Sequence, residues 1–265
     1  MRAALKILRD VAEHRRLLIA TTRIELMKRY AGSVLGFFWI VLNPMLFLSV
    51  YVFLYLVVFK TTWPGTSAVG YTIFVFAGLI PFLAFMEASN GSVQLIRTNL
   101  HFVKNLVFPA DLIPVRQVLT AFVAEFVGLA ILLVLAVIDD SLSWKLILLP
   151  VLIAIQFLLL VGTAFLCAGF GLLLPDFGYF LGTFLMLLLF LSPIGFRTGT
   201  LTGPIRLIVV LNPFTYMIEA FRSVLIPDNG LDALSLSLYT LISVAVFIVG
   251  SSFFYRLRAH LVDYE

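Results

Sequence analysis

Long intervals without a charged residue constrain the fold of this chain more than any other feature. No Asp, Glu, Lys or Arg stands between Arg29 and Lys60, or between Lys60 and Glu87. A bilayer core requires about 20 apolar residues per helix. Only 12% of the 265 residues are charged, and the mean hydropathy is +1.11. The sequence therefore predicts an all-α polytopic membrane protein.

The uncharged intervals predict six transmembrane helices. They are expected near Val34–Phe59, Val69–Met86 and Val115–Ile138, and in the intervals Lys145–Asp176, Asp176–Arg197 and Asp232–Arg256. Thirteen of the eighteen basic residues lie in the N-terminal tail, the segment after the second helix and the C-terminal tail. Because segments rich in Lys and Arg remain in the cytoplasm, both termini are expected to be cytoplasmic.

Residues 197–232 do not fit an ordinary loop. Two short apolar segments meet at Asn212-Pro213, and the second contains Glu219 and Arg222. Segments of this length favour a re-entrant helical hairpin between helices five and six, with its broken backbone shielded by protein or facing a watery cavity. The alternative is a seventh span, which would place the C-terminal tail on the opposite side.

The N-terminal segment, residues 1–31, is amphipathic. Leu17, Ala20, Ile24 and Met27 share one helical face, away from the arginines. This pattern predicts a helix that lies along the cytoplasmic interface. Its role is either a membrane anchor or a docking platform for a cytoplasmic partner.

The cytoplasmic segment 93–114 mixes apolar and basic residues, and Pro109 and Pro114 bracket a short element. One interpretation is a solvated loop. The other is a short helix that is presented to the cytosol and sits in the groove of another protein.

Motifs of enzymes are absent from the sequence. It has no G-x-x-x-x-G-K-[ST] phosphate loop, and its three histidines and single cysteine lack metal-ligand spacing. The basic residues lie beside membrane segments, so they do not indicate nucleic-acid binding. We therefore expect no catalytic activity, no metal and no nucleic-acid partner.

Glu125 is the only charge well inside a predicted span. Ionisable residues within a membrane are costly and are candidates for function. Three interpretations remain open: a structural pairing with another helix, a position at a wet lateral face, and proton coupling.

The start of the first predicted helix combines small residues with a helix breaker. Gly32 and Gly36 are four residues apart, a spacing that permits close approach to another helix. Asn43-Pro44 removes a helical hydrogen bond and predicts a kink.

An aromatic stripe follows the kink, because four rings recur at every fourth position. These rings are Phe47, Tyr51, Tyr55 and Phe59. They serve either packing and lipid contact, or a channel wall on which the C–H faces of sugar rings slide.

Several segments together resemble type-2 ABC export permeases, and most closely the permeases that export O-antigen, teichoic acid or capsule. They are Arg23–Leu48, Val103–Val115, Leu191–Phe196 and Leu211–Leu225. One departure is Pro175-Asp176, where the family commonly has an arginine before the aspartate.

The resemblance implies the transmembrane subunit of an ATP-driven transporter in a bacterial cytoplasmic (inner) membrane. Two copies would form a homodimeric pore among membrane lipids, and two copies of a separate ABC ATPase would bind ATP and Mg. This chain would then hold no cofactor. The implied cargo is an undecaprenyl-diphosphate-linked polysaccharide of the O-antigen type. The alternatives are a type-2 permease for a drug or lipid, and an ion-coupled secondary transporter.

The resemblance also assigns roles to residues. The ATPase-coupling set comprises Arg97, His101, Lys104, Phe108 and Asp111. The outer-gate set comprises Asn212, Pro213, Glu219 and Arg222. The lipid diphosphate is expected to enter near Arg15, Arg16, Lys28 and Arg29.

Overall fold

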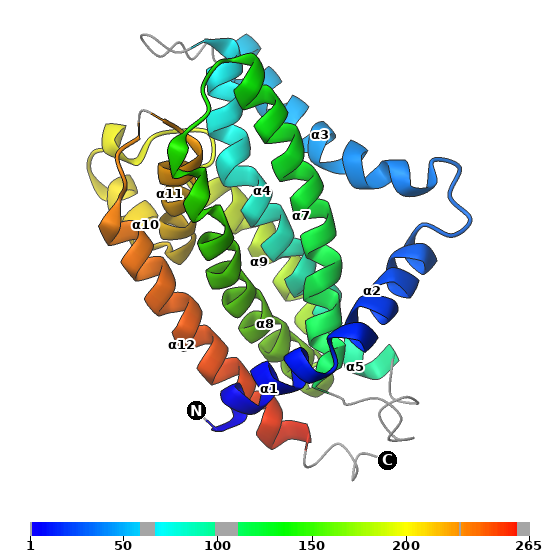
Figure 1. Ribbon diagram of the computed structural model, residues 1–265. Coiled ribbons are helices and arrows are strands. Elements are labelled where there is room, and N and C mark those ends of the chain that lie inside the picture. The colour runs from blue at the N-terminus through cyan, green and yellow to red at the C-terminus, as the bar shows by residue number, and fades with distance from the viewer. Residues whose placement is uncertain (1, 59–66, 99–110, 228, 259–265) are drawn as a thin grey trace.

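The computed structural model describes residues 2–58, 67–98, 111–227 and 229–258, and helices make up most of these residues (Figure 1). Within those ranges there is no β-strand. The helices are α1 (Arg2–Glu13), α2 (Arg15–Arg29), η1 (Gly36–Phe38), α3 (Trp39–Val52), the π-helix η2 (Phe53–Val58), α4 (Ala68–Val93), α5 (Leu95–Thr98), α7 (Leu112–Ile138), η3 (Trp144–Leu148), α8 (Leu149–Leu173), α9 (Phe177–Leu191), η4 (Thr198–Thr200), α10 (Pro204–Leu211), α11 (Pro213–Leu225) and α12 (Ala233–Arg258).

Four helices in the described ranges are long and apolar enough to cross a membrane: Ala68–Val93, Leu112–Ile138, Trp144–Leu173 and Ala233–Leu257. They correspond to the second, third, fourth and sixth predicted spans. The first and fifth predicted spans correspond to the shorter apolar helices Gly36–Val52 and Phe177–Leu191. Helices α10 and α11 form a pair bent by 78°, which would give a fifth span if the pair crosses as one. The protein is therefore all-helical with four or five candidate spans.

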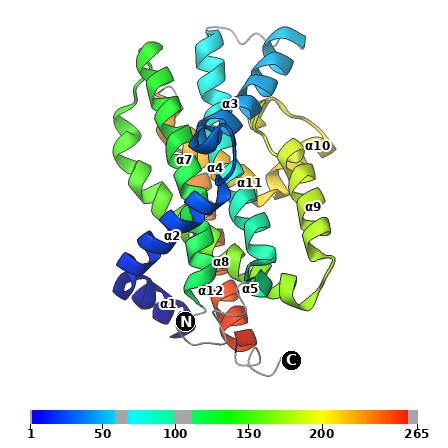
Figure 2. The ribbon, with the colours of Figure 1, turned by 90° about the vertical axis from the view of Figure 1, so that its right-hand side faces the viewer.

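Helix α4 lies at the centre of the bundle and contacts α7, α8 and α11 (Figures 1 and 2). In its most apolar window 72% of the residues are buried, against 28–39% for the other three long helices. Because neighbours cover α4 on several sides, its apolar residues surround the helix instead of forming one stripe.

Glycines allow α8 and α12 to pack closely. A Cβ atom at Gly162 would lie 2.6 Å from the backbone of Phe247, and one at Gly250 would lie 2.1 Å from the carbonyl oxygen of Gly162. Close backbone approach through small residues is a common basis of helix association in membranes.

Gly32 and Gly36 serve a different purpose from the one that their spacing predicts. Their φ angles are +77° and +51°, and a Cβ atom at either would meet nothing within 4 Å. The prediction of a close helix contact here was wrong. The two glycines allow the left-handed backbone of the turn between α2 and α3.

The N-terminal segment forms two helices instead of one, with a break at His14. Ala4 and Ile7 of α1 and Leu18 of α2 are buried against the bundle. On α2 the predicted apolar face is exposed, as Ile24 and Met27 show at 51% and 53%. That face remains available for lipid, and the interfacial position is still a prediction.

Candidate functional site

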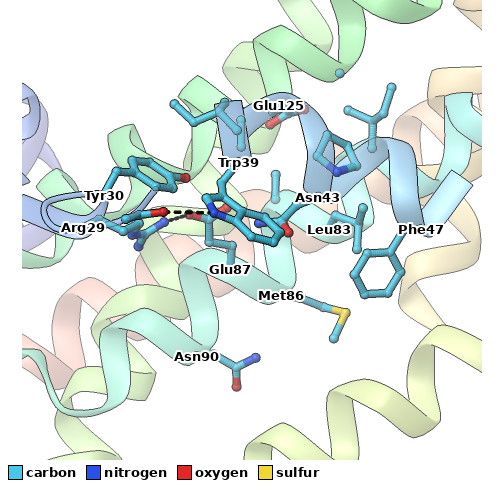
Figure 3. Close-up of a pocket in the computed structure, with 17 residues that line it drawn as sticks. Arg29, Tyr30, Trp39, Asn43, Phe47, Leu83, Met86, Glu87, Asn90 and Glu125 are labelled. Carbon is cyan, nitrogen blue, oxygen red and sulfur yellow. Dashed lines mark hydrogen bonds and ion pairs between the residues drawn. The ribbon is translucent and has the colours of Figure 1, made fainter. Parts of the chain in front are cut away.

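A cavity of about 630 Å³ lies between the end of α2, the start of α3, and helices α4 and α7 (Figure 3). Its lining includes Asn43 and Phe47 from α3, Asn90 from α4 and Glu125 from α7. The wall therefore brings the kink motif and one ring of the aromatic stripe, which are neighbours on α3, together with the carboxyl of Glu125, which is about 80 residues away in sequence.

An ion pair between Arg29 of α2 and Glu87 of α4 borders this cavity (Figure 3). Partial burial disfavours the charged guanidinium, but the charge of Glu87 and the hydrogen bond to it outweigh that cost and raise the pKa of Arg29. A second ion pair joins Arg116 of α7 to Glu25 of α2 at 3.4 Å. The two pairs hold the C-terminal half of α2 against α4 and α7.

The predicted diphosphate-binding residues do not form one site. Arg15 and Arg16 begin α2 and Lys28 and Arg29 end it, which separates the two groups by about 20 Å along the helix. Arg29 is neutralised by Glu87. Helix α2 thus carries basic residues at both ends, and the entry of the lipid diphosphate near them stays a prediction.

The kink motif lies within a continuous helix, because α3 extends through Pro44. Trp39, just before it, donates a hydrogen bond from Nε1 to Ser33 Oγ at 3.1 Å. This contact connects the start of α3 to the turn that follows α2.

The aromatic stripe is only partly in place. Phe47 lines the cavity and is 43% exposed, whereas Tyr51 is 9% exposed and packs in the core. The helix carrying the stripe changes from α to π at Phe53. The side chain of Tyr55 and the whole of Phe59 lie outside the described residues, so their place in a channel stays a prediction.

Of the coupling set, the structure describes Arg97 and Asp111. Arg97 Nη2 donates to the carbonyl oxygen of Leu172 at 2.9 Å, which attaches α5 to the end of α8. Asp111 is buried next to the start of α7. His101, Lys104 and Phe108 lie outside the described residues.

Arg222 is a fully buried charge with partners on three sides. Its side chain is fully buried and pairs with Glu219 at 3.2 Å. Nη2 donates to the carbonyl of Ile194 at 2.5 Å, and Nε donates to the carbonyl of Phe74 at 3.3 Å. The guanidinium also stacks 3.5 Å from the ring centroid of Phe74. These contacts fix α11 to α4 and to the segment after α9.

The break between α10 and α11 is stabilised by Asn212. Its side chain caps α11 by accepting from Phe214 N at 3.0 Å, and its Nδ2 donates to Ser192 Oγ at 2.9 Å. Pro213 follows at the first position of α11, where its missing N–H costs nothing. The Asn-Pro motif thus ends one helix and starts the next.

Lys145 is a functional contact that the sequence gave no reason to single out. Its buried Nζ donates to the carbonyls of Ile226 and Pro227 at 2.9 and 3.1 Å, and also to that of Asn229. The ammonium therefore binds three backbone oxygens of the segment after α11. In the sequence Lys145 is an isolated lysine, and nothing in the pattern indicates its partners. Its acceptors are backbone groups more than 80 residues away.

Glu125 is buried in a small polar cluster between helices. Gln156 of α8 and Tyr239 of α12 are buried near it on neighbouring helices. Gln156 Nε2 donates to the carbonyl of Pro81 at 3.2 Å, whereas both Glu125 oxygens and the Tyr239 hydroxyl lack a hydrogen bond within normal distance. The three interpretations of Glu125 therefore stay open. Among the described residues no three metal-ligating side chains gather.

The fold defines a class, that of helical multi-pass membrane proteins. The family of ABC-2 type transporters matches residues 16–226, a stretch that begins within α2 and ends one residue after α11. The chain belongs to this family, as the sequence motifs predicted.

Three individual relatives are similar to this chain over most of their length. The chain is 27% identical over 262 residues to the O-antigen export system permease protein RfbA of Myxococcus xanthus, covering 98% of this chain and 99% of that protein. It is 27% identical over 250 residues to RfbA of Klebsiella pneumoniae, covering 93% and 94%. It is 26% identical over 247 residues to the polysialic acid transport protein KpsM of Escherichia coli, covering 88% and 90%.

Proposed function

We propose that this chain is the transmembrane subunit of an ABC transporter that exports a lipid-linked polysaccharide across the cytoplasmic membrane. The observation that carries the proposal is the end-to-end similarity to a protein named as an O-antigen export permease, with 98% and 99% coverage. As a permease subunit, the chain moves its cargo and leaves ATP hydrolysis to a partner.

The proposed topology has six transmembrane helices and a re-entrant hairpin. Helices α3 and α9 would be the additional spans, with α3 extended by η2, and the bent pair α10–α11 would enter and leave one leaflet. Both ends of the described chain lie at the same end of the bundle, next to α5 (Figures 1 and 2). With the excess of basic residues there, this end is assigned to the cytoplasm of a bacterial cell.

The proposed assembly contains two copies of this chain and two ABC ATPase subunits that bind ATP and Mg. Family membership supports an ATPase partner. Its contact would fall on the cytoplasmic segment that begins with α5, where Arg97 is attached to the end of α8. A push on α5 would then be transmitted directly to a long helix.

Within the outer-gate region, the two limbs of the hairpin have different roles. Helix α11 is fixed by Arg222 and Lys145, whereas α10 has only Val209 buried, and Leu211 is 80% exposed. We assign α10 as the limb that moves when the exit opens, and α11 as its support.

The second candidate cargo is a capsular polysaccharide, because a relative named for polysialic acid transport covers 88% of this chain. Both relatives are named for the export or transport of a glycan and match most of this chain, so the same permease architecture is compatible with either cargo. No observation of the structure favours a drug, a lipid or an ion-coupled mechanism.

Deletion of the gene in its native host tests the proposal. The expected result is loss of surface polysaccharide together with accumulation of lipid-linked glycan accessible only from the cytoplasmic side, restored by the wild-type gene. Surface polysaccharide at the normal level, with no accumulated intermediate, contradicts the function. Chemical analysis of the accumulated glycan distinguishes O-antigen from capsule.

A further inference from the structure

A second cavity lies outside the site described above, between the N-terminal helices and the bundle. It has a volume of about 820 Å³ and is bounded by α2, α7 and α8, with Leu8 of α1 at one end. Three aromatic rings form its floor. Phe122 stacks on Phe126 and on Phe157, with centroid distances of 5.7 and 6.2 Å.

The groove runs along the helices instead of across them. Its lining extends from Leu119 to Phe126 on α7 and from Leu158 to Pro150 on α8, and either stretch corresponds to about 10–12 Å of helix. One end lies beneath α1 and α2, and the other reaches the start of α8. An elongated apolar groove with this orientation fits an extended hydrocarbon chain.

The end beneath α2 is basic. Arg23 lines the groove, and Arg16 lies on the same face of α2, two turns away. Both side chains are exposed, and no ion pair to either occurs among the described residues. Arg29 and Arg116, in contrast, have carboxylate partners. The groove therefore offers uncompensated positive charge at one end only.

One polar atom in the groove lacks a partner. Thr22 is 7% exposed and lines the cavity, and its Oγ1 makes no hydrogen bond. The neighbouring Thr21 hydroxyl, in contrast, donates to the carbonyl of Leu17 at 2.8 Å. Buried polar groups are almost always paired, so Thr22 indicates a place where a ligand oxygen completes the site.

We propose that this groove binds one acyl chain of an anionic phospholipid, whose phosphate is held by Arg23 and Arg16. The acyl chain lies over the three phenylalanines, and the glycerol ester oxygens lie near Thr22. In the proposed topology, α2 is at the cytoplasmic surface, where anionic headgroups attract basic segments. The inference goes beyond polysaccharide export and does not depend on the identity of the cargo.

A second copy of this chain is a poorer occupant. A two-fold contact places the same surface patch on both sides, so the arginines of one copy would face those of the other. Like charges brought together in this way oppose association. An anionic lipid instead matches both the apolar floor and the basic end.

The test measures lipid binding to the full chain, purified in detergent, by native mass spectrometry. Phosphatidylglycerol and phosphatidylcholine with identical acyl chains are titrated separately. The expected result is one saturable phosphatidylglycerol per chain and several-fold weaker phosphatidylcholine binding. Arg23→Gln is expected to weaken phosphatidylglycerol binding about fivefold. The matched control is Arg15→Gln, which removes an exposed arginine of the same helix that does not line the groove.

A second pair of variants tests the apolar part of the site. Ala154→Phe fills the groove and is expected to abolish saturable binding, whereas Ala130→Phe, at an exposed position of α7 outside the groove, leaves it unchanged. Gel filtration and thermal unfolding confirm that both variants are folded.

Three results overturn the proposal. Equal binding of the two phospholipids, or an equal loss with Arg15→Gln and Arg23→Gln, shows only diffuse attraction to the surface. Displacement of phosphatidylglycerol by undecaprenyl diphosphate in an Arg23-dependent manner assigns the groove to the cargo lipid. The deletion phenotype of the gene bears on export alone, so either proposal can fail without the other.

Discussion

Arg222 and Arg29 have the same side chain but hold two parts of the molecule in different ways. Arg222 is fully buried and joins α11 to two other segments through the backbone carbonyls of Phe74 and Ile194, and it also pairs with Glu219 of its own helix. Arg29 is 34% exposed and has one carboxylate partner, Glu87, at the side of a cavity. The first arrangement cannot open without leaving buried polar groups unpaired, whereas the second can open into water at little cost. We therefore expect the contacts of Arg222 to contribute much more to stability than the contact between Arg29 and Glu87.

The largest expected effect comes from Arg222→Gln. It leaves the carbonyls of Ile194 and Phe74 and the carboxylate of Glu219 without their donor, and should lower the free energy of unfolding by about 3–5 kcal/mol. Thermal unfolding of the purified protein measures this, with the exposed Arg206→Gln of α10 as the control.

The double variant Glu219→Gln/Arg222→Gln sharpens this prediction. Simple ion pairing predicts that removal of both partners is milder than removal of one. The two carbonyl acceptors of Arg222 predict instead that the double variant is nearly as unstable as Arg222→Gln, and that Glu219→Gln alone costs about 1 kcal/mol. Full recovery in the double variant would mean that the carbonyl contacts contribute nothing.

The next effect distinguishes two kinds of glycine. Gly162→Ala forces a Cβ atom to within 2.6 Å of the Phe247 backbone and should cost about 1–3 kcal/mol. Gly36→Ala meets open space but has a φ of +51°, so it should cost about 1 kcal/mol.

Substitution by asparagine distinguishes the steric clash expected at Gly162 from the backbone strain expected at Gly36. Asparagine tolerates the left-handed conformation but is larger than alanine. Gly36→Asn should melt close to wild type, and Gly162→Asn should be worse than Gly162→Ala. The same ranking at both positions would contradict the distinction between turn glycine and packing glycine.

Lys145→Met should cost about 1–3 kcal/mol, because the carbonyls of Ile226 and Pro227 lose a buried donor. Lys28→Met, at the exposed end of α2, should change stability by less than about 0.5 kcal/mol. Denaturation midpoints of the two variants test this contrast, and equal midpoints would refute a structural role for Lys145.

The smallest effect is expected at the cavity. Arg29→Gln and Glu87→Gln should each change stability by about 0–1 kcal/mol, since both side chains are about one-third exposed. The effect should shrink further at high salt. A loss comparable to that of Arg222→Gln would contradict the expected difference between the two arginines.

The uncharged intervals of the sequence were enough to locate the long helices. The interval between Lys60 and Glu87 predicted α4, and its C-terminal end was missed because Glu87 lies inside the helix. The break at Asn212-Pro213 was also correctly placed, since both residues act on the adjacent backbone. The positions of long helices and of this helix break depend on local composition and local hydrogen bonding, and both can be predicted from the sequence.

The partners of the polar residues were decided by tertiary structure alone. The acceptors of Arg222 and Lys145 are main-chain carbonyls up to 148 residues away in sequence. Because every residue has a main-chain carbonyl, the sequence does not indicate which one serves as an acceptor. Gly36 and Gly162 are both glycine, and the sequence does not distinguish their roles. Only the approach of α12 makes Gly162 a helix-packing residue. Hydrophobic periodicity determines where a helix forms. Which helices meet, and therefore which charges and glycines matter, is determined by packing between segments that are distant along the chain.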